Sequence, residues 1–254
     1  MSLADVLLLL AAGFAGGTVN AIAGGATFFT FPAMLAAGVP PVAANASNTV
    51  ALFPASLAAS VALRRELASV RPHLPRLLAI GVAGGIAGAV LLLATPDRAF
   101  MALVPWLLLL ATLIFAFSPQ LLAWVRAHRG ADAVTFRPGA GTLLLIAFCA
   151  VYGGYFGAGI GIMMMAGLAL AGLEDLQVAN ALKNLLAGAI NGIAVVVFVA
   201  SGVVVWPAAL VMLAGAVLGG VFGARIARRI PKLAFRWLVI AIGSLLTVWY
   251  FLRP

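Results

Sequence analysis

Long apolar runs constrain this chain most, because four of them are each long enough to cross a membrane as a helix. The hydrocarbon core of a bilayer takes about 20 helical residues. The four runs cover residues 99–118, 139–158, 177–200 and 203–224. Only 8% of the 254 residues are charged, whereas a soluble domain carries about 25%. The sequence therefore predicts an all-α polytopic membrane protein without a separate soluble domain.

Breaks at glycine, proline and charged residues divide the chain into ten apolar pieces. Two of them, residues 24–37 and 159–172, are short for a full crossing. We expect both to be broken or re-entrant helices. The pieces cover roughly residues 5–22, 24–37, 42–63, 74–94, 99–118, 139–157, 159–172, 177–200, 203–224 and 236–252.

Basic residues gather in three stretches between these pieces. Because short loops rich in Lys and Arg stay in the cytoplasm, we expect all three there and both termini outside. The net charge of +9 does not indicate nucleic-acid binding, since the charges sit in short loops between apolar runs. The stretches consist of Arg64, Arg65, Arg71 and Arg76; of Arg126, Arg129 and Arg137; and of Arg225, Arg228, Arg229, Lys232 and Arg236.

An internal repeat relates the two halves of the chain. Residues 84–100 and 219–235 are identical at seven of 17 positions when they are aligned at an offset of 135 residues. An odd number of crossings in each half would invert the second copy, which explains why only that copy is rich in basic residues. We therefore predict two inverted-topology repeats of about five helical segments each, a common transporter plan. They cover residues 1–125 and 139–254, and a cytoplasmic linker covers residues 126–138.

Two glycine-broken hairpins occupy corresponding places in the halves, over residues 15–32 and 152–167. A chain that turns back within the membrane leaves backbone N–H groups unpaired at the start of the short helix. That helix start also carries partial positive charge, which suits an anionic substrate. Close helix packing is the alternative role for glycine, and we prefer it for the GxxxG pairs. These pairs are Gly13/Gly17, Gly84/Gly88 and Gly219/Gly223.

Polar stripes follow one face of an apolar helix in each half. An asparagine amide donates two hydrogen bonds, so it can hold an oxyanion without adding charge. Interhelical hydrogen bonding is an equal alternative for each asparagine singly, whereas the duplication favours a site. The stripes are Asn45, Asn48, Leu52 and Ser56 in the first half, and Asn180, Asn184, Ala187 and Asn191 in the second.

Lys183 is the one ionisable residue well inside an expected span. A charge at mid-bilayer costs about 2.5–3.5 kcal/mol on insertion scales, and we interpret Lys183 as the counter-charge of a substrate anion. The alternative is that it snorkels to the interface and anchors a helix end. All six acids lie in loops or at ends, so no buried carboxylate is expected to bind a cation. No catalytic cluster occurs in the spans, and we expect no enzyme, cofactor or metal site.

Together these motifs resemble the TauE/SafE sulfite-exporter family. The resemblance covers nearly the whole chain and rests on residues 15–54, on residues 152–198 with their YGGYFGAGIG and NALKN elements, and on residues 219–231. Two mild departures are Ala26, where many members have a third glycine, and the Asn-Ala-Ser-Asn sequence that ends at Asn48. The resemblance implies export or uptake of sulfite or a small organosulfur anion such as a sulfonate, across a bacterial plasma (inner) membrane. Composition and spacing alone indicate only a small anion.

The sequence thus predicts alternating access around a central site, with a small anion and the lipid bilayer as partners and a homodimer left open. Transport of another solute, such as a carboxylate, and a non-transporting membrane scaffold remain as alternatives. The expected substrate-binding residues are Asn20, Gly24, Gly25, Thr27, Asn45, Ser47, Asn48, Tyr152, Gly159, Gly161, Asn180, Lys183, Asn184 and Asn191.

Overall fold

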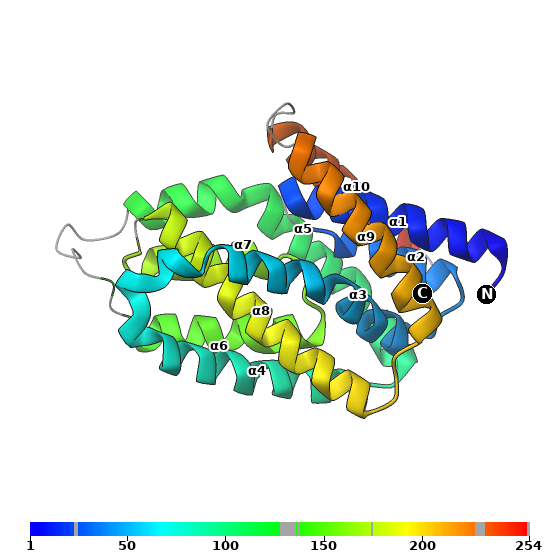
Figure 1. Cartoon of the computed structure of the whole chain (residues 1–254), viewed down its shortest axis with the longest axis horizontal. Helices are drawn as coiled ribbons and strands as arrows, with labels where there is room; N and C mark the ends of the chain where they lie inside the picture. Colours follow the sequence, from blue (N-terminus) through cyan, green and yellow to red (C-terminus); the bar gives the residue numbers. More distant parts are fainter. Residues whose placement is uncertain (23–24, 128–135, 137, 174, 227–231, 253–254) are drawn as a thin grey trace.

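The structure is a computed structural model that describes residues 1–22, 25–127, 136, 138–173, 175–226 and 232–252. Ten α-helices and one 3₁₀ helix run through the described residues (Figure 1). Five spans are long and apolar enough to cross a membrane, and shorter apolar helices accompany them. The prediction of an all-α polytopic membrane protein is therefore confirmed. The elements are α1 (Leu3–Ile22), α2 (Thr27–Ala36), α3 (Pro41–Ala62), η1 (Arg64–His73), α4 (Leu74–Ala94), α5 (Asp97–Ala127), α6 (Ala140–Tyr155), α7 (Ile160–Leu170), α8 (Leu176–Ala200), α9 (Trp206–Ile226) and α10 (Lys232–Leu252).

The ten expected pieces correspond one to one to these helices, with one extension. Helix α5 continues to Ala127 although Pro119 lies inside it. A proline there removes the N–H that would bond to the carbonyl four residues earlier. Ser118 Oγ donates to that carbonyl, Phe115 O, at 3.1 Å, so the helix continues past the proline. The expected linker begins within α5, and its residues 128–135 and 137 lie outside the described part of the chain.

The short helices α2 and α7 each fold back on the long helix before them. Helix α2 has 10 residues and packs on α1, and α7 has 11 residues and packs on α6. In each hairpin a glycine of the long helix makes room for a side chain of the short one. Thr30 lies over Gly16, and Ile160 lies over Gly153. The two hairpins are therefore built by the same local device.

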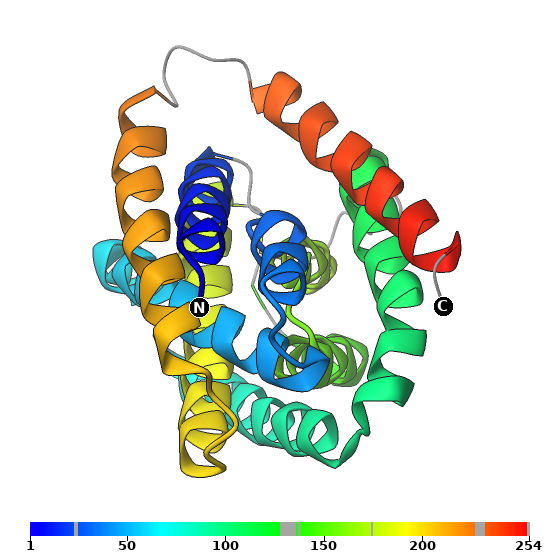
Figure 2. The same ribbon diagram turned by 90° about the vertical axis from the view of Figure 1, so that its right-hand side faces the viewer.

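The two five-helix halves pack against each other rather than side by side as separate bodies. The main pairs are α1 with α9, α4 with α6, α3 with α8 and α5 with α10. Figure 2 shows the α1–α9 and α5–α10 pairs along the two flanks, with α2 and α7 enclosed between them. Exchanging the halves converts the α1–α9 pair into the α6–α4 pair and leaves the other two pairs unchanged. The packing pattern is thus the same from either half.

Glycines make the closest of these contacts. A Cβ added to Gly219 would collide with Phe14 O, and one added to Gly88 would collide with Val151 O. Gly17 likewise lies directly against Ala216 O. Helix association inside a bilayer depends on such van der Waals contact, because lipid removes the hydrophobic driving force. The packing interpretation of the GxxxG pairs is therefore confirmed.

Two adjacent glycines of α9 give a matched test of this packing. Gly219→Ala should lower stability by about 1–3 kcal/mol, the usual cost of overpacking. Gly220→Ala should be neutral or slightly stabilising, because nothing lies within 4 Å of its added Cβ and alanine favours helix over glycine. Thermal unfolding of both variants in detergent measures the difference. Equal midpoints for the two variants would contradict the contact.

Candidate functional site

The chain breaks before α2 and α7 come together on one helix, α5. Gly25, with φ +94°, precedes α2, and an ideal Cβ on it would lie 3.1 Å from Phe115 Cζ. Gly159, with φ +76°, precedes α7, and its Cβ would lie 3.5 Å from Ala111 Cβ. Glycine is required at both positions because other residues rarely adopt positive φ. Residues 111 and 115 are about one turn, or 6 Å, apart along α5, so the two breaks converge.

Neither short helix has a side-chain cap at its start. The N-cap residues Ala26 of α2 and Gly159 of α7 form no side-chain hydrogen bond. Helix α8 is different, because Asp175 Oδ1 accepts hydrogen bonds from Gln177 N at 2.8 Å and Val178 N at 3.2 Å. The first amides of a helix carry partial positive charge and need an acceptor. The starts of α2 and α7 therefore present donors that no side chain neutralises.

Lys183 lies beside the start of α7. Its side chain is half-buried on α8, and Lys183 Cδ lies 3.4 Å from the position of a Cβ on Gly161. Gly161 is the second residue of α7, so the aliphatic part of the lysine packs on the first turn. The arrangement adds a cationic side chain to the positive end of the α7 dipole.

The described acids lie elsewhere and mostly serve as helix caps. Asp97 Oδ1 accepts from Val42 N at 2.8 Å, and Asp5 Oδ2 accepts from the Ser2 amide at 2.7 Å. Asp175 caps α8, and Glu66 is exposed in η1. Carboxylates at helix starts offset the helix dipole. None of these four described acids lies against the starts of α2 and α7.

The asparagines of α3 hold the α6–α7 break from the opposite side. Asn45 Nδ2 donates to Tyr155 O, at the last residue of α6, at 2.8 Å. Asn45 and Asn48 are only 1% and 2% exposed, and within the described structure their Oδ1 atoms have no hydrogen-bond partner. The nearby Ser47 Oγ accepts from Val205 N at 2.9 Å, so it joins α3 to the segment before α9. One amide hydrogen of Asn45 therefore belongs to the fold, as the interhelical interpretation expects.

The asparagines of α8 do not meet those of α3. Ser60 Oγ donates to Asn184 O at 2.7 Å, and Gly192 lies against the Phe53 ring. The two helices therefore run antiparallel. Asn48 is 12 residues before Ser60, or about 18 Å along α3, and it lies far from the level of Asn184. The polar stripes are thus separated along the helix pair rather than gathered at one point.

The other predicted residues occupy varied surroundings. Thr27 is buried in the first turn of α2, and Asn180 and Asn191 are half-buried on α8. Asn20 is exposed on α1, away from the interior. Gly24 lies outside the described residues.

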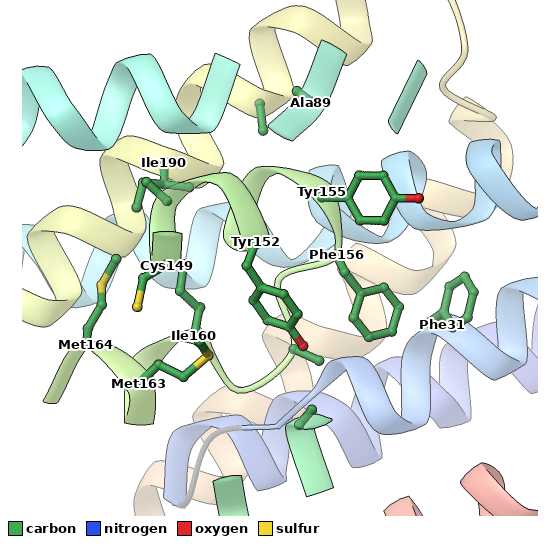
Figure 3. Packing of buried hydrophobic residues seen from close by; sticks show 14 of the residues in the cluster. Phe31, Ala89, Cys149, Tyr152, Tyr155, Phe156, Ile160, Met163, Met164 and Ile190 are labelled. Atoms are coloured by element: carbon green, nitrogen blue, oxygen red, sulfur yellow. The ribbon is translucent and has the colours of Figure 1, made fainter. Parts of the chain in front are cut away.

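An aromatic cluster links the two broken segments. Phe31 of α2 lies edge-on to Phe156 of the α6–α7 break, with ring centroids 5.7 Å apart, and Phe100 packs on both. The ring of Tyr152 is 6.4 Å from that of Phe156, and its hydroxyl donates to Leu107 O at 3.5 Å. Figure 3 shows Phe31 opposite Phe156, with Tyr152 beside the break. The sequence analysis missed Phe31 and Phe156, because aromatic residues in apolar runs carry no signal of which distant partner they contact.

Comparison with known proteins gives a consistent result. Residues 9–250 match the family described as sulfite exporter TauE/SafE. A probable membrane transporter protein, ORF9, of a Sinorhizobium species is 34% identical over 86% of this chain and 82% of its own. A probable membrane transporter protein of Haemophilus influenzae is 30% identical over 94% and 92%. The Escherichia coli K12 protein YfcA, also named a probable membrane transporter, is 27% identical over 91% and 84%. No solved structure shows a significant match.

The hydrogen bond from Asn45 to the break can be tested by stability. Asn45→Ala should destabilise the protein by about 1–3 kcal/mol, because it leaves the buried Tyr155 carbonyl unpaired. The control is Asn20→Ala, which removes an exposed asparagine and should change little. Thermal unfolding in detergent measures both, and an unchanged midpoint for Asn45→Ala would argue against the role of this bond.

Proposed function

We propose that this chain, which belongs to the sulfite exporter TauE/SafE family, carries a small anion across the membrane. The observation that carries the proposal is the convergence of two uncapped helix starts on neighbouring turns of α5, with Lys183 beside one of them. Helix N-termini bind oxyanions through backbone amides and the helix dipole. Broken helices that meet near the middle of the membrane are a frequent substrate site in transporters.

Family membership and the site agree on the general class of activity. The relatives are named as membrane transporters, in line with the expectation that the chain is not an enzyme. Within that class, sulfite or a small sulfonate suits the site best. Each offers several oxygen acceptors to the amides of α2 and α7 and to the three N–H donors of a lysine ammonium. The described carboxylates lie away from this place and do not oppose an anion.

Two alternatives make different predictions. A carboxylate is also a small anion and could use the same donors, so only a comparison of substrates separates it from a sulfur oxyanion. A membrane scaffold needs no cation beside a helix start and would show no saturable flux. The half-buried Lys183 next to Gly161 favours a transporter, because an intramembrane cation is costly unless it has a function.

The packing of the halves supports the inverted repeat and alternating access. Gly84 and Gly88 face Ala147 O and Val151 O, whereas Gly219 and Gly223 face Phe14 O and Thr18 O. Thus glycines 135 residues apart meet carbonyls 133 residues apart, as two related halves of about residues 1–125 and 139–254 would produce. Rocking of one half against the other would expose the α2–α7 site to each side in turn.

Substitution of Lys183 tests the anion site directly. In proteoliposomes, the wild type should show saturable flux of sulfite or a small sulfonate and a lower rate with a carboxylate of similar size. Lys183→Ala should abolish that flux, because the counter-charge is lost. Lys183→Arg should retain part of it, because the charge remains in a larger group.

Arg225→Ala serves as the control for a lost positive charge, because Arg225 is exposed at the end of α9. Its flux should equal that of the wild type. Normal flux in Lys183→Ala at equal reconstitution would support snorkelling and refute the counter-charge. Faster flux of the carboxylate would replace the proposed substrate.

Cysteine labelling tests the inverted arrangement. Cys149 is buried, so it should not react, and Pro96→Cys and Arg225→Cys provide exposed sites after α4 and at the end of α9. In intact cells, a membrane-impermeant maleimide should label the first from outside and the second only after permeabilisation. Labelling of both from the same side would show that the halves are not inverted.

A further inference from the structure

Arg236 is not where its place in the sequence suggests. It belongs to a run of basic residues expected in a cytoplasmic loop, yet it is half-buried on α10. Its Nε donates to Phe115 O at 3.2 Å and its Nη2 donates to Ala116 O at 2.6 Å. Both acceptors are backbone carbonyls of α5. The guanidinium is therefore turned toward the interior of the helix bundle and is held by neutral partners.

The bend at Pro119 explains why these carbonyls are available. Because Pro119 has no N–H, Phe115 O lacks its usual helical donor. Ser118 Oγ already donates to Phe115 O at 3.1 Å, so the carbonyl keeps a partner when the arginine leaves it. Carbonyls do not compensate a positive charge as a carboxylate does. Arg236 thus retains an unneutralised charge and acceptors that it can give up.

This charge lies beside the start of α2. Val239, one turn along α10 from Arg236, has Cγ1 3.2 Å from the Cβ position on Gly25. The Phe115 ring, whose carbonyl accepts from Arg236, also contacts Gly25 and lies edge-on to Phe28 with centroids 5.8 Å apart. Arg236 therefore stands toward the start of α2 as Lys183 stands toward that of α7.

A second polar group in the same place lacks a partner. Thr112 of α5 is 5% exposed, and in the described structure its Oγ1 has no hydrogen-bond partner. The hydroxyl lies against Gly243 of α10, and the Phe28 ring of α2 contacts the same glycine. Arg236, Val239 and Gly243 share one face of α10. Cation, free hydroxyl and uncapped helix start thus line the same α2–α5–α10 junction.

From these contacts we propose that Arg236 is a second substrate-binding cation, which exchanges its α5 carbonyls for the oxygens of the anion at the start of α2, with Thr112 as a further donor. The inference rests on the proposed anion transport and refines its substrate class. A planar guanidinium binds two oxyanion oxygens at once. With Lys183 and Arg236 at two converging helix starts, the site favours a small divalent oxyanion over a monovalent one.

The rival role is a clamp in which Arg236 only fastens α10 to α5. A clamp affects stability, and its loss lowers the transport of all substrates alike. A substrate-binding cation instead changes KM, and changes it more for a divalent anion. The positive charge is also the essential property of a binding cation, so lysine should replace arginine in part.

The experiment measures KM in proteoliposomes for sulfite, at a pH where it is a dianion, and for methanesulfonate, a monoanion. Arg236→Gln should raise the KM for sulfite by about tenfold or more, as the loss of a charged hydrogen-bond partner does, and that for methanesulfonate by less. Arg236→Lys should stay within about threefold of the wild type. Arg225→Gln, at an exposed arginine, should change neither value.

Thr112→Val supplies a second variant whose folding is not at risk, because the buried hydroxyl it removes has no partner in the described structure. It should raise the KM for sulfite several-fold, whereas Thr112→Ser should not. An unchanged KM for sulfite in Arg236→Gln would overturn the inference. Equal losses for both substrates, together with a lower unfolding midpoint, would assign the clamp. Absence of saturable flux in the wild type would instead refute the proposed function, and the inference with it.

Discussion

The need to satisfy backbone polar groups inside a bilayer governs this structure. A continuous helix pairs its own N–H and C=O groups, but a helix that begins within the membrane leaves its first amides unpaired. The chain accepts that cost twice, at Gly25 and Gly159, and brings both starts to neighbouring turns of α5. Other helix starts are capped by acids such as Asp97 and Asp175. The two uncapped starts are consequently the places where an external acceptor has most to offer.

Close packing of the halves keeps these starts in place. Glycine faces on α1 and α9, and on α4 and α6, let backbones touch, which gives rigid contacts where lipid provides no hydrophobic drive. The α2 and α7 segments lie between these pairs and are joined through Phe31 and Phe156. Rigid flanks around short central helices are compatible with motion of one half against the other, as alternating access requires.

Positive charge is distributed unequally between the related halves. At the offset of 135 residues, Lys183 corresponds to Asn48 and Arg236 to Met101. Both cations therefore come from the second half, although each lies beside a different short helix. An inverted pair of halves with identical charges would give a symmetric field across the bilayer. The unequal distribution makes one approach to the site more attractive to an anion than the other.

The sequence by itself determined the membrane class, the ten helical pieces and the two breaks, because hydrophobic length and glycine position are local properties. It also singled out Lys183, since a charge within an apolar run is visible without a structure. The tertiary structure alone decided which distant segments meet. It separated Asn48 from Asn184 along antiparallel helices and turned Arg236 from an expected loop charge into a donor to α5 carbonyls. Contacts between distant segments depend on how helices pack in three dimensions, and no local pattern of residues encodes that.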